Sequence, residues 1–534
     1  MNEQRRSLLA AGLSLLVLIG WFYFFGDKIV PPPPAQVPAA VATVVPQSAQ
    51  GSQEAALPDT KVLRETPLVG IEWSSRVGAP SSVLLKRYRE TVDKKSPPRN
   101  LIPFDGEKAL EVLCDGCNQT LPDQFRLAKR ATGPSTLNGI SFEGEKGGVV
   151  LRKEYEWKED QYLFNLKLTF ENRGEKEFRG RVGLGWQAKQ FPEPPKGMFG
   201  FLRRPGNQRT LLYQTGTDVK HLHKQEKQEL RGVIPWAGIE DRYFLIALIS
   251  RRISSDQGVS LDVQGGQLNL GLYPGEVSIP PGGRHEELFS FYLGPKERES
   301  LQVAGVSLEK AIDYGWFSIL AIPILKTLQI FHSFLKNWGL AVILLTLVIK
   351  LLMNPLTLKS MKQMKEMQTL QPKLAELKER YKDDRQRLNM EMMQLFKTHK
   401  VNPMGGCFPM LLQMPIYIVL YKVLWNAIEL YHAPFVGFYR DLSAPDPYFI
   451  LPILLGISMV AQQKLTPSAS ADPMQKQMMM LMPIMFTSFM LFLPVGLVLY
   501  IFINTLFSVI QQVMYQRGIR LRDLVKLGRR PTTS

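Results

Sequence analysis

The stretch AVILLTLVIKLLMNPLT, residues 341–357, is almost wholly apolar but carries Lys350 in its centre. It lies in a longer apolar run, Trp338–Thr357, which has about the length that an α-helix needs to cross a bilayer. A charge in the hydrocarbon core costs free energy, so such a residue usually faces a wet cavity or a polar partner. The stretch therefore predicts a membrane-spanning helix with a functional cation.

Other apolar runs surround this one. They are Ser7–Phe25, Phe408–Glu429, Tyr448–Gln463, Met478–Leu493 and Val495–Met514, of which the last two are separated by Pro494. Together with Trp338–Thr357 they predict six spans. Residues 314–337 mix Lys, Gln, His and Pro into an apolar stretch, which favours an amphipathic helix lying at the membrane surface.

The N-terminal run admits two interpretations, an uncleaved anchor over residues 1–28 and a cleaved signal peptide. Gly26-Asp27-Lys28 and a proline run follow it instead of a small-residue cleavage site, which favours the anchor. Residues 29–60 are rich in Pro, Ala, Val and Gln, and this composition predicts a disordered linker.

Residues 61–300 have a different pattern. Runs such as FNLKLTFEN and VSLDVQGGQLNLGLY alternate apolar and polar residues, as strands with one wet face do. We expect a large β-sandwich outside the cytoplasm, because one span precedes it. Cys114 and Cys117 lie here; a local disulfide is favoured, with a redox pair and half a zinc site as the alternatives.

The charge distribution predicts the topology. Residues 358–407 hold 11 Lys and Arg against 6 Asp and Glu, and residues 517–534 hold 6 against 1. The loop 430–447 has only Arg440 against Asp441 and Asp446. Positive residues gather in cytoplasmic loops, so both termini are expected in the cytoplasm. Orientation accounts for most of the net charge of +17, and DNA is not expected as a partner.

Polar residues recur at helical spacing within three spans. Thr346 and Lys350 lie four apart, and two further stripes are Gln413, Tyr417 and Tyr421, and Tyr500, Asn504, Ser508 and Gln512. All three fall in the cytoplasmic half of the predicted membrane, which indicates one hydrophilic groove and no continuous pore. The alternatives are snorkelling or a structural ion pair for Lys350, and helix–helix hydrogen bonding for the other stripes.

Residues 358–407 predict a cytoplasmic helical hairpin. Apolar residues recur at threes and fours over 358–381, Pro372 is expected to kink this helix, and Asp383-Asp384 marks a turn before a second helix. The apolar stripes of the two helices either pack on each other or bind clients. Methionine suits an adaptable surface for varied apolar partners. The expected contact residues are Met361, Met364, Met367 and Met392.

Several motifs carry a family resemblance. They are KNWG at 336–339, HKVNPMGGCFPMLLQMPI at 399–416, DLSAPDPYFILPILLG at 441–456, DPMQKQMMMLMPIMF at 472–486 and LPVGLVLY at 493–500. Over residues 314–515 the chain resembles the bacterial YidC membrane protein insertases in their Gram-negative form. The resemblance implies a periplasmic β-supersandwich at 61–300, a five-span insertase core at 338–514 and a basic cytoplasmic tail at 515–534, in the inner membrane.

The resemblance also bears on the groove. Lys350 occupies the place of the family's single groove arginine, so the charge is kept but the planar five-donor fork is lost. Thr346, Gln413, Met414 and Tyr500 match groove positions of the family. Ile501 stands where a second tyrosine often follows.

Taken together, the sequence predicts a polytopic α-helical membrane protein that acts as an insertase and chaperone. Its expected partners are nascent membrane proteins, membrane lipids, the ribosome and the Sec translocon. No GxxxxGK[ST] motif occurs, so no nucleotide, cofactor, metal or enzymatic activity is expected. A small-solute transporter and a carbohydrate-sensing receptor are the rival classes. The tail could bind RNA or lipid equally well.

Overall fold

The computed structural model describes residues 58–131, 138–192, 208–222, 226–382, 384–399, 401, 408–465 and 473–518. The predicted anchor, nearly all of the predicted linker and most of the basic tail lie outside the described residues. The chain divides into two compact units, of which the first contains the strands and the second contains the helices from α3 onward. Each is described by itself.

The strand unit is built from three hydrogen-bonded sheets among the described residues. The four-stranded sheet has the order β1 (Lys61–Glu65), β2 (Val69–Ser74), β3 (Ala79–Arg89) and β4 (Pro98–Asn100). The five-stranded sheet has the order β13 (Lys227–Arg231), β16 (Gly258–Gln264), β17 (Gln267–Ile279), β10 (Phe178–Lys189) and β5 (Lys108–Asp115).

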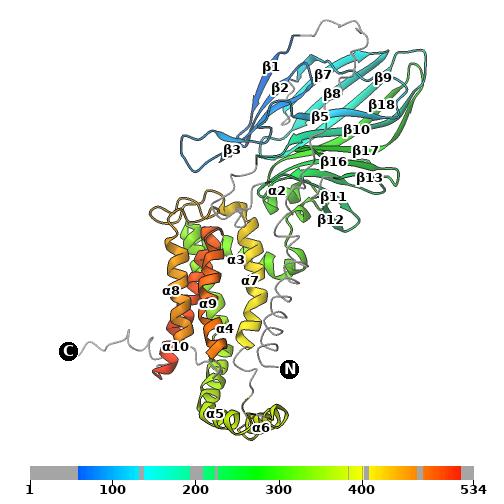
Figure 1. Ribbon diagram of the computed structural model, residues 1–534. Helices are drawn as coiled ribbons and strands as arrows, with labels where there is room; N and C mark the ends of the chain where they lie inside the picture. The colour runs from blue at the N-terminus through cyan, green and yellow to red at the C-terminus, as the bar shows by residue number, and fades with distance from the viewer. Residues whose placement is uncertain are drawn as a thin grey trace, which may run out of the picture. The chain divides into compact units, whose positions relative to one another are not determined.

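The nine-stranded sheet is the largest of the three (Figure 1). Its order is β12 (Asp218–Leu222), β11 (Thr210–Thr215), β14 (Trp236–Glu240), β15 (Phe244–Ser250), β18 (Arg284–Pro295), β9 (Leu163–Asn172), β8 (Val149–Trp157), β7 (Asn138–Lys146) and β6 (Arg126–Ala131).

The sheets pack face to face through apolar side chains. Trp73 of β2 lies against the rings of Tyr155 and Trp157 of β8, with centroids 4.5 and 6.0 Å apart. On the five-stranded sheet, β17 packs against β11, β14 and β15. The expected alternation holds in β9, where Phe164, Leu166, Leu168 and Phe170 are buried. A face-to-face arrangement follows because each sheet has one apolar face to remove from water.

The predicted run VSLDVQGGQLNLGLY is the β16–β17 hairpin. Gln264 pairs with Gln267, and Gly265 and Gly266 form the two-residue turn with φ of 57° and 80°. Positive φ at both positions is the requirement of a type I′ turn, which glycine meets without steric cost. The two glycines therefore set the register of the pair.

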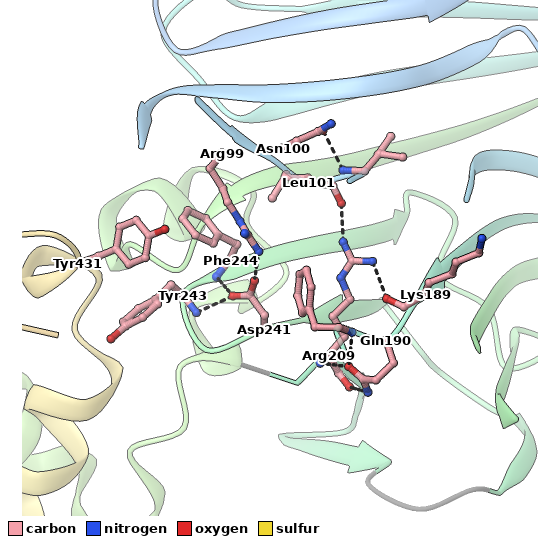
Figure 2. Close-up of polar contacts among 12 residues, drawn as sticks. Arg99, Asn100, Leu101, Lys189, Gln190, Arg209, Asp241, Tyr243, Phe244 and Tyr431 are labelled. Atoms are coloured by element: carbon pink, nitrogen blue, oxygen red, sulfur yellow. Dashed lines mark hydrogen bonds and ion pairs between the residues drawn. The ribbon is translucent and has the colours of Figure 1, made fainter. Parts of the chain in front are cut away.

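Buried ion pairs connect distant strands of this unit (Figure 2). Arg99 of β4 pairs with Asp241 at 3.2 Å, and Asp241 also accepts from the backbone amides of Tyr243 and Phe244. Arg209 donates to the carbonyl oxygens of Leu101 and Lys189 at 2.7 and 3.0 Å. Buried pairs cost desolvation, so this network is better understood as fixing strand positions than as adding stability.

Lys153 is a fully buried cation in the nine-stranded sheet. Its Nζ donates to the carbonyl oxygens of Val77 and Leu110 at 3.2 and 3.4 Å, and it lies 4.3 Å from the centroid of the Phe125 ring. Burial lowers the pKa of Lys153 to about 7, because removal from water disfavours the charged ammonium. Between this value and the ordinary lysine value, the folded chain binds fewer protons than the unfolded chain.

We expect the free energy of unfolding to rise with pH across that window, by up to about 1.4 kcal/mol per pH unit. Lys153→Met should remove the rise, because the neutral side chain has no proton to lose. Urea unfolding of the full chain at pH 7 and pH 9, followed by tryptophan fluorescence, measures it. Lys167→Met is the matched control on β9, since Lys167 is a partly exposed lysine paired with Glu286 at 2.9 Å. If the free energy of unfolding still rises with pH in Lys153→Met, the rise does not come from Lys153.

The helical unit contains α3 (Ser318–Leu335), α4 (Trp338–Thr369), α5 (Gln371–Arg380), α6 (Arg385–Thr398), α7 (Phe408–Asn426), α8 (Ile450–Leu465), α9 (Pro473–Met490) and α10 (Val495–Gln516). The short helix α2 (Arg298–Val303) precedes them in the chain. Helix α10 packs against α8, α4 and α7, and α9 packs against α8 (Figure 1). Leu345, Leu424, Val498 and Tyr500 belong to the shared apolar core.

By length and composition, three helices of the described residues suffice to cross a membrane: α3, α4 and α10. Helix α8 and Leu481–Met490 within α9 are shorter apolar helices. The helices α7 to α10 overlap the predicted spans, but the count of six stays a prediction. The placement of residues 314–337 at the membrane surface also stays a prediction, because α3 meets the length criterion for a span.

The segment 358–407 differs from the expectation in one respect. Helix α4 continues past the predicted end of its span and ends at Thr369. Leu370 lies between it and α5, which begins at Gln371. Pro372 therefore does not kink a helix; it occupies the first turn of a new one, where its missing N–H is not needed. Asp384 caps α6 by accepting from the Arg387 amide at 3.0 Å.

The KNWG motif forms the corner between α3 and α4. Lys336 adopts a left-handed conformation, with φ of 53°. Asn337 caps α4 by accepting from the Leu340 amide and donates to the Phe435 carbonyl oxygen at 2.8 Å. The Phe435 ring lies directly over Gly339, where an added Cβ would meet ring carbons 2.0 and 2.5 Å away. The corner thus depends on the absence of a side chain at residue 339.

Gly339→Ala should destabilise the helical unit by about 1–3 kcal/mol, the usual cost of overpacking. In a Phe435→Ala background the same change should cost much less, because the opposing ring is gone. A double-mutant cycle on thermal unfolding in detergent measures this coupling. Equal costs in the two backgrounds would show that the ring does not set the requirement.

Candidate functional site

Lys350 lies inside the helical unit with only 8% of its surface exposed. Its Nζ donates to the Ser508 hydroxyl of α10 at 2.7 Å. Within the described part of the chain no carboxylate stands beside it as a counter-ion. The ammonium therefore donates one hydrogen bond to a neutral oxygen, and its positive charge stays uncompensated.

Thr346 lies one turn before Lys350 and is fully buried. Its hydroxyl donates to the Val342 carbonyl oxygen of the same helix at 2.7 Å. Such back-bonding satisfies the hydroxyl without a partner on another helix. Thr346 therefore adds polarity to this face of α4 but is not positioned as a ligand of the ammonium.

The stripe on α10 meets the stripe on α7. Asn504 donates through Nδ2 to the Tyr417 hydroxyl, and Gln413 donates through Nε2 to the Tyr500 hydroxyl at 3.2 Å. The Tyr417 and Tyr500 rings lie edge to face, with centroids 5.9 Å apart. Ser508 extends the same α10 stripe to Lys350 on α4. The structure thus brings six of the predicted residues into one polar cluster, from three helices.

Within this cluster, Asn504 leaves one polar atom unused. The side chain is buried, and its Oδ1 has no hydrogen-bond partner among the described residues. Unpaired buried acceptors are costly, and their occurrence in native proteins calls for an explanation. The cluster therefore contains an uncompensated cation, Lys350 of α4, and an unused acceptor on Asn504, one turn of α10 before the partner of that cation.

Other predicted residues lie differently. Met414 has 42% of its surface exposed. Tyr421 stacks on Trp425 with ring centroids 5.6 Å apart. Gln512 donates to the Leu465 carbonyl oxygen of α8 at 2.7 Å, so it ties α10 to α8.

One polar contact was missed by the sequence reasoning. Gln511 of α10 donates to Asn354 of α4 at 2.5 Å, one helical turn beyond Lys350. The spacing of four between Lys350 and Asn354 was a signal for it. Asn354 lies inside the predicted span Trp338–Thr357 and inside α4, which continues through Pro355, but it was not named among the polar stripes.

Lys422 and Glu429 lie near the C-terminal end of α7, away from Lys350, and each has a polar partner. Lys422 lies 3.5 Å from Asp313, and Glu429 accepts from Gln329 of α3 at 2.9 Å. Asn426 donates to the Asp313 carbonyl oxygen at 3.3 Å. Neither Asp313 nor Glu429 is a partner of Lys350, which agrees with an uncompensated cation in the core.

The described methionines of α6 and of the C-terminal part of α4 fall into two groups. Met361, Met364 and Met367 on α4 and Met392 on α6 are half-buried. The most exposed are Met390 and Met393 of α6, at 60% and 61%. The periodicity placed α6 correctly but could not decide which of its faces turns outward.

In the strand unit, Cys114 and Cys117 are joined by a disulfide at the end of β5, with Cα atoms 5.7 Å apart. Gly180 of β10 gives room for this turn, since a Cβ there would overlap Cys117. Within the described ranges, no three His, Cys, Asp or Glu side chains gather in a way that could hold a metal ion.

Two family models match the chain. The family described as "60Kd inner membrane protein" matches residues 330–522, and the "YidC periplasmic domain" matches residues 62–327. The two matches meet within α3, at residues 327 and 330. They identify residues 62–327 with a periplasmic domain and the later helices with an inner membrane protein.

Curated relatives match nearly the full length of the chain. The protein named membrane protein insertase YidC from Geotalea daltonii is 34% identical, with 97% of this chain and 99% of the relative covered. The protein of the same name from Lawsonia intracellularis is 36% identical, covering 96% and 98%. A solved structure titled as an active YidC insertase aligns with a TM-score of 0.38 at 17% identity, over 86% of this chain and 95% of that one. The chain belongs to the YidC family of membrane protein insertases.

Proposed function

We propose that this protein inserts nascent proteins into the bacterial inner membrane and assists their folding. The observation that carries the proposal is the buried Lys350, bonded to Ser508 with no carboxylate beside it among the described residues. A cation without a counter-ion in an apolar bundle is costly, and this cost indicates a functional site. Homologues that are named insertases over the full length of the chain support the same conclusion.

The proposed topology has six spans with both termini in the cytoplasm. The anchor crosses first, the strand unit lies in the periplasm, and α4, α7, α8, α9 and α10 form the insertase core. Helix α3 lies at the periplasmic surface of the membrane, where its exposed apolar residues face lipid; these are Ile319, Leu320, Ile330 and Phe334. The basic loop 358–407 and the basic tail support this orientation.

The first step is reception of the client. Helices α5 and α6 form a hairpin at the cytoplasmic side, beyond the end of α4. Met390 and Met393 expose flexible, polarizable side chains that adapt to varied apolar segments. The hairpin receives the segment from the ribosome, and the chain acts alone or beside the Sec translocon.

The second step is partial transfer of a hydrophilic segment. The polar cluster of α4, α7 and α10 lies in a groove open to the cytoplasm and to lipid. Its hydroxyl and amide groups replace water for the polar groups of the client, which lowers the cost of leaving the aqueous phase. Lys350 attracts an acidic side chain of that segment. As a point charge with rotatable donors it favours no particular carboxylate geometry, in contrast to an arginine.

The third step is release into lipid. The apolar span of the client leaves along α4 and α10, which present outward-facing apolar residues such as Leu351, Leu352, Leu506 and Ile510. Burial of its apolar surface in the bilayer supplies about 25 cal/mol per Å². The membrane potential acts in addition on the negative segment that crosses. No covalent step is required.

The charge of Lys350 is testable in proteoliposomes that contain only this protein. Lys350→Ala should reduce insertion of a single-span client with an acidic outer segment by about tenfold, whereas Lys350→Arg should keep most of it, because a charge-assisted interaction contributes about 1.5–3 kcal/mol. Protease protection of the client's outer segment gives the readout. Lys422→Ala removes a cation from the other end of α7 and should have little effect. Full insertion by Lys350→Ala would refute the role of the charge.

The exposed face of α6 gives a second prediction. Changing Met390 and Met393 together to Gln should lower the capture of an apolar client, because the hydrophobic contact is lost while helix propensity is nearly unchanged. Site-specific crosslinking from α6 to a ribosome-bound nascent chain measures capture. The matched control is Met392→Gln, a half-buried neighbour on the same helix. Equal crosslinking in all variants would contradict a receiving role for this face.

A further inference from the structure

The Ser508 hydroxyl connects α4 and α10 at the site of the buried cation. It accepts from the Lys350 ammonium at 2.7 Å and donates to the Asn504 carbonyl oxygen of its own helix at 2.9 Å. A hydroxyl has one proton and two lone pairs. Because the proton is committed to Asn504, only lone pairs face Lys350. The orientation of the hydroxyl is therefore set by its own helix before the ammonium arrives.

The lysine side chain needs such a fixed partner. Its four-carbon stem is flexible, and its head is a compact charge with three rotatable donors. Ser508 takes one donor and holds the ammonium against α10. Two N–H groups then remain for a client carboxylate.

We propose that Ser508 is a positioning residue, which fixes the ammonium of Lys350 at the height and on the side of the groove where an acidic client segment binds. This inference rests on the proposed insertase function. Ser508 does not itself contact the client carboxylate. It determines where the positive charge stands.

This role is separable from helix packing. The spacing between α4 and α10 is also held by the Gln511–Asn354 contact one turn away, and Tyr417 is already bonded to Asn504. Loss of one hydroxyl therefore leaves the helices joined. It leaves the ammonium without its only hydrogen-bond partner among the described residues.

The test compares Ser508→Ala with Ser508→Thr in the full chain in proteoliposomes. Two clients are used, identical except that the acidic residues of one outer segment are changed to Asn and Gln. Ser508→Ala should lower insertion of the acidic client about tenfold more than insertion of the neutral client. Ser508→Thr should restore the wild-type ratio between the two clients, because the threonine hydroxyl can donate and accept in the same way.

Thr505→Ala is the matched control. The Thr505 hydroxyl makes the same kind of bond to its own helix, to the Ile501 carbonyl oxygen at 2.8 Å, but does not contact Lys350. Its removal should not change the ratio between the two clients. A Ser508→Ala variant that lowers both clients equally indicates a structural role only, and one that lowers neither shows that the hydroxyl is dispensable; either result overturns the proposal.

Failure of this inference is distinguishable from failure of the proposed function. If Lys350→Ala also leaves the ratio between the clients unchanged, the charge itself has no role and the groove mechanism is wrong. If Lys350→Ala lowers the acidic client and Ser508→Ala does not, only the positioning by Ser508 is refuted.

Discussion

The helical unit is organised around a positive charge in an apolar bundle with no acid beside it among the described residues. A buried ammonium needs hydrogen-bond acceptors, and here the acceptor comes from a different helix, since Ser508 of α10 meets Lys350 of α4 at 2.7 Å. This requirement fixes which face of α10 turns toward α4. The same rotation brings Asn504 and Tyr500 to α7, where they meet Tyr417 and Gln413. The Lys350–Ser508 hydrogen bond thus fixes the rotation of α10 about its own axis, and with it the contacts of α10 with both α4 and α7.

That constraint acts together with the apolar contacts. Leu345 of α4 and Val498 of α10 belong to the same buried core, so the N-terminal halves of these two helices are held by packing. The hydrogen bonds lie in the part where the packing is interrupted by polar groups. In the proposed mechanism, a polar client segment enters beside Lys350 while the packing at the other end keeps the helices together. The Asn337 and Gly339 corner fixes that other end against Phe435.

Much of this arrangement follows from periodicity. Alternation in β9 and spacing of four in α4, α7 and α10 are consequences of backbone geometry, so the sandwich strands and the three polar stripes could be predicted. Other features depend on tertiary contact. Three such features are the Asn354–Gln511 pair, the outward face of α6 and the end of α4 before Leu370. Each depends on what the helix packs against, and residue spacing in the sequence does not reveal that. The burial of Lys153 could not be predicted for the same reason, because a lysine in a strand ordinarily faces water.

Lys153 and Lys350, two of the buried lysines among the described residues, differ in what holds them. Lys153 donates to the backbone carbonyl oxygens of Val77 and Leu110, whose positions are fixed by the strands and turns around them. It cannot change partner without local unfolding, so it is a structural cation whose charge depends on pH. Lys350 is held by a single side-chain hydroxyl at 2.7 Å, and a carboxylate is a stronger acceptor than a hydroxyl. In the proposed mechanism, a client carboxylate bonds the two N–H groups of Lys350 that Ser508 leaves free, and this charge-assisted bond favours an acidic segment over a neutral one. Lys153 is fully buried among strand residues, whereas the proposed role of Lys350 uses donors that its single partner leaves unoccupied.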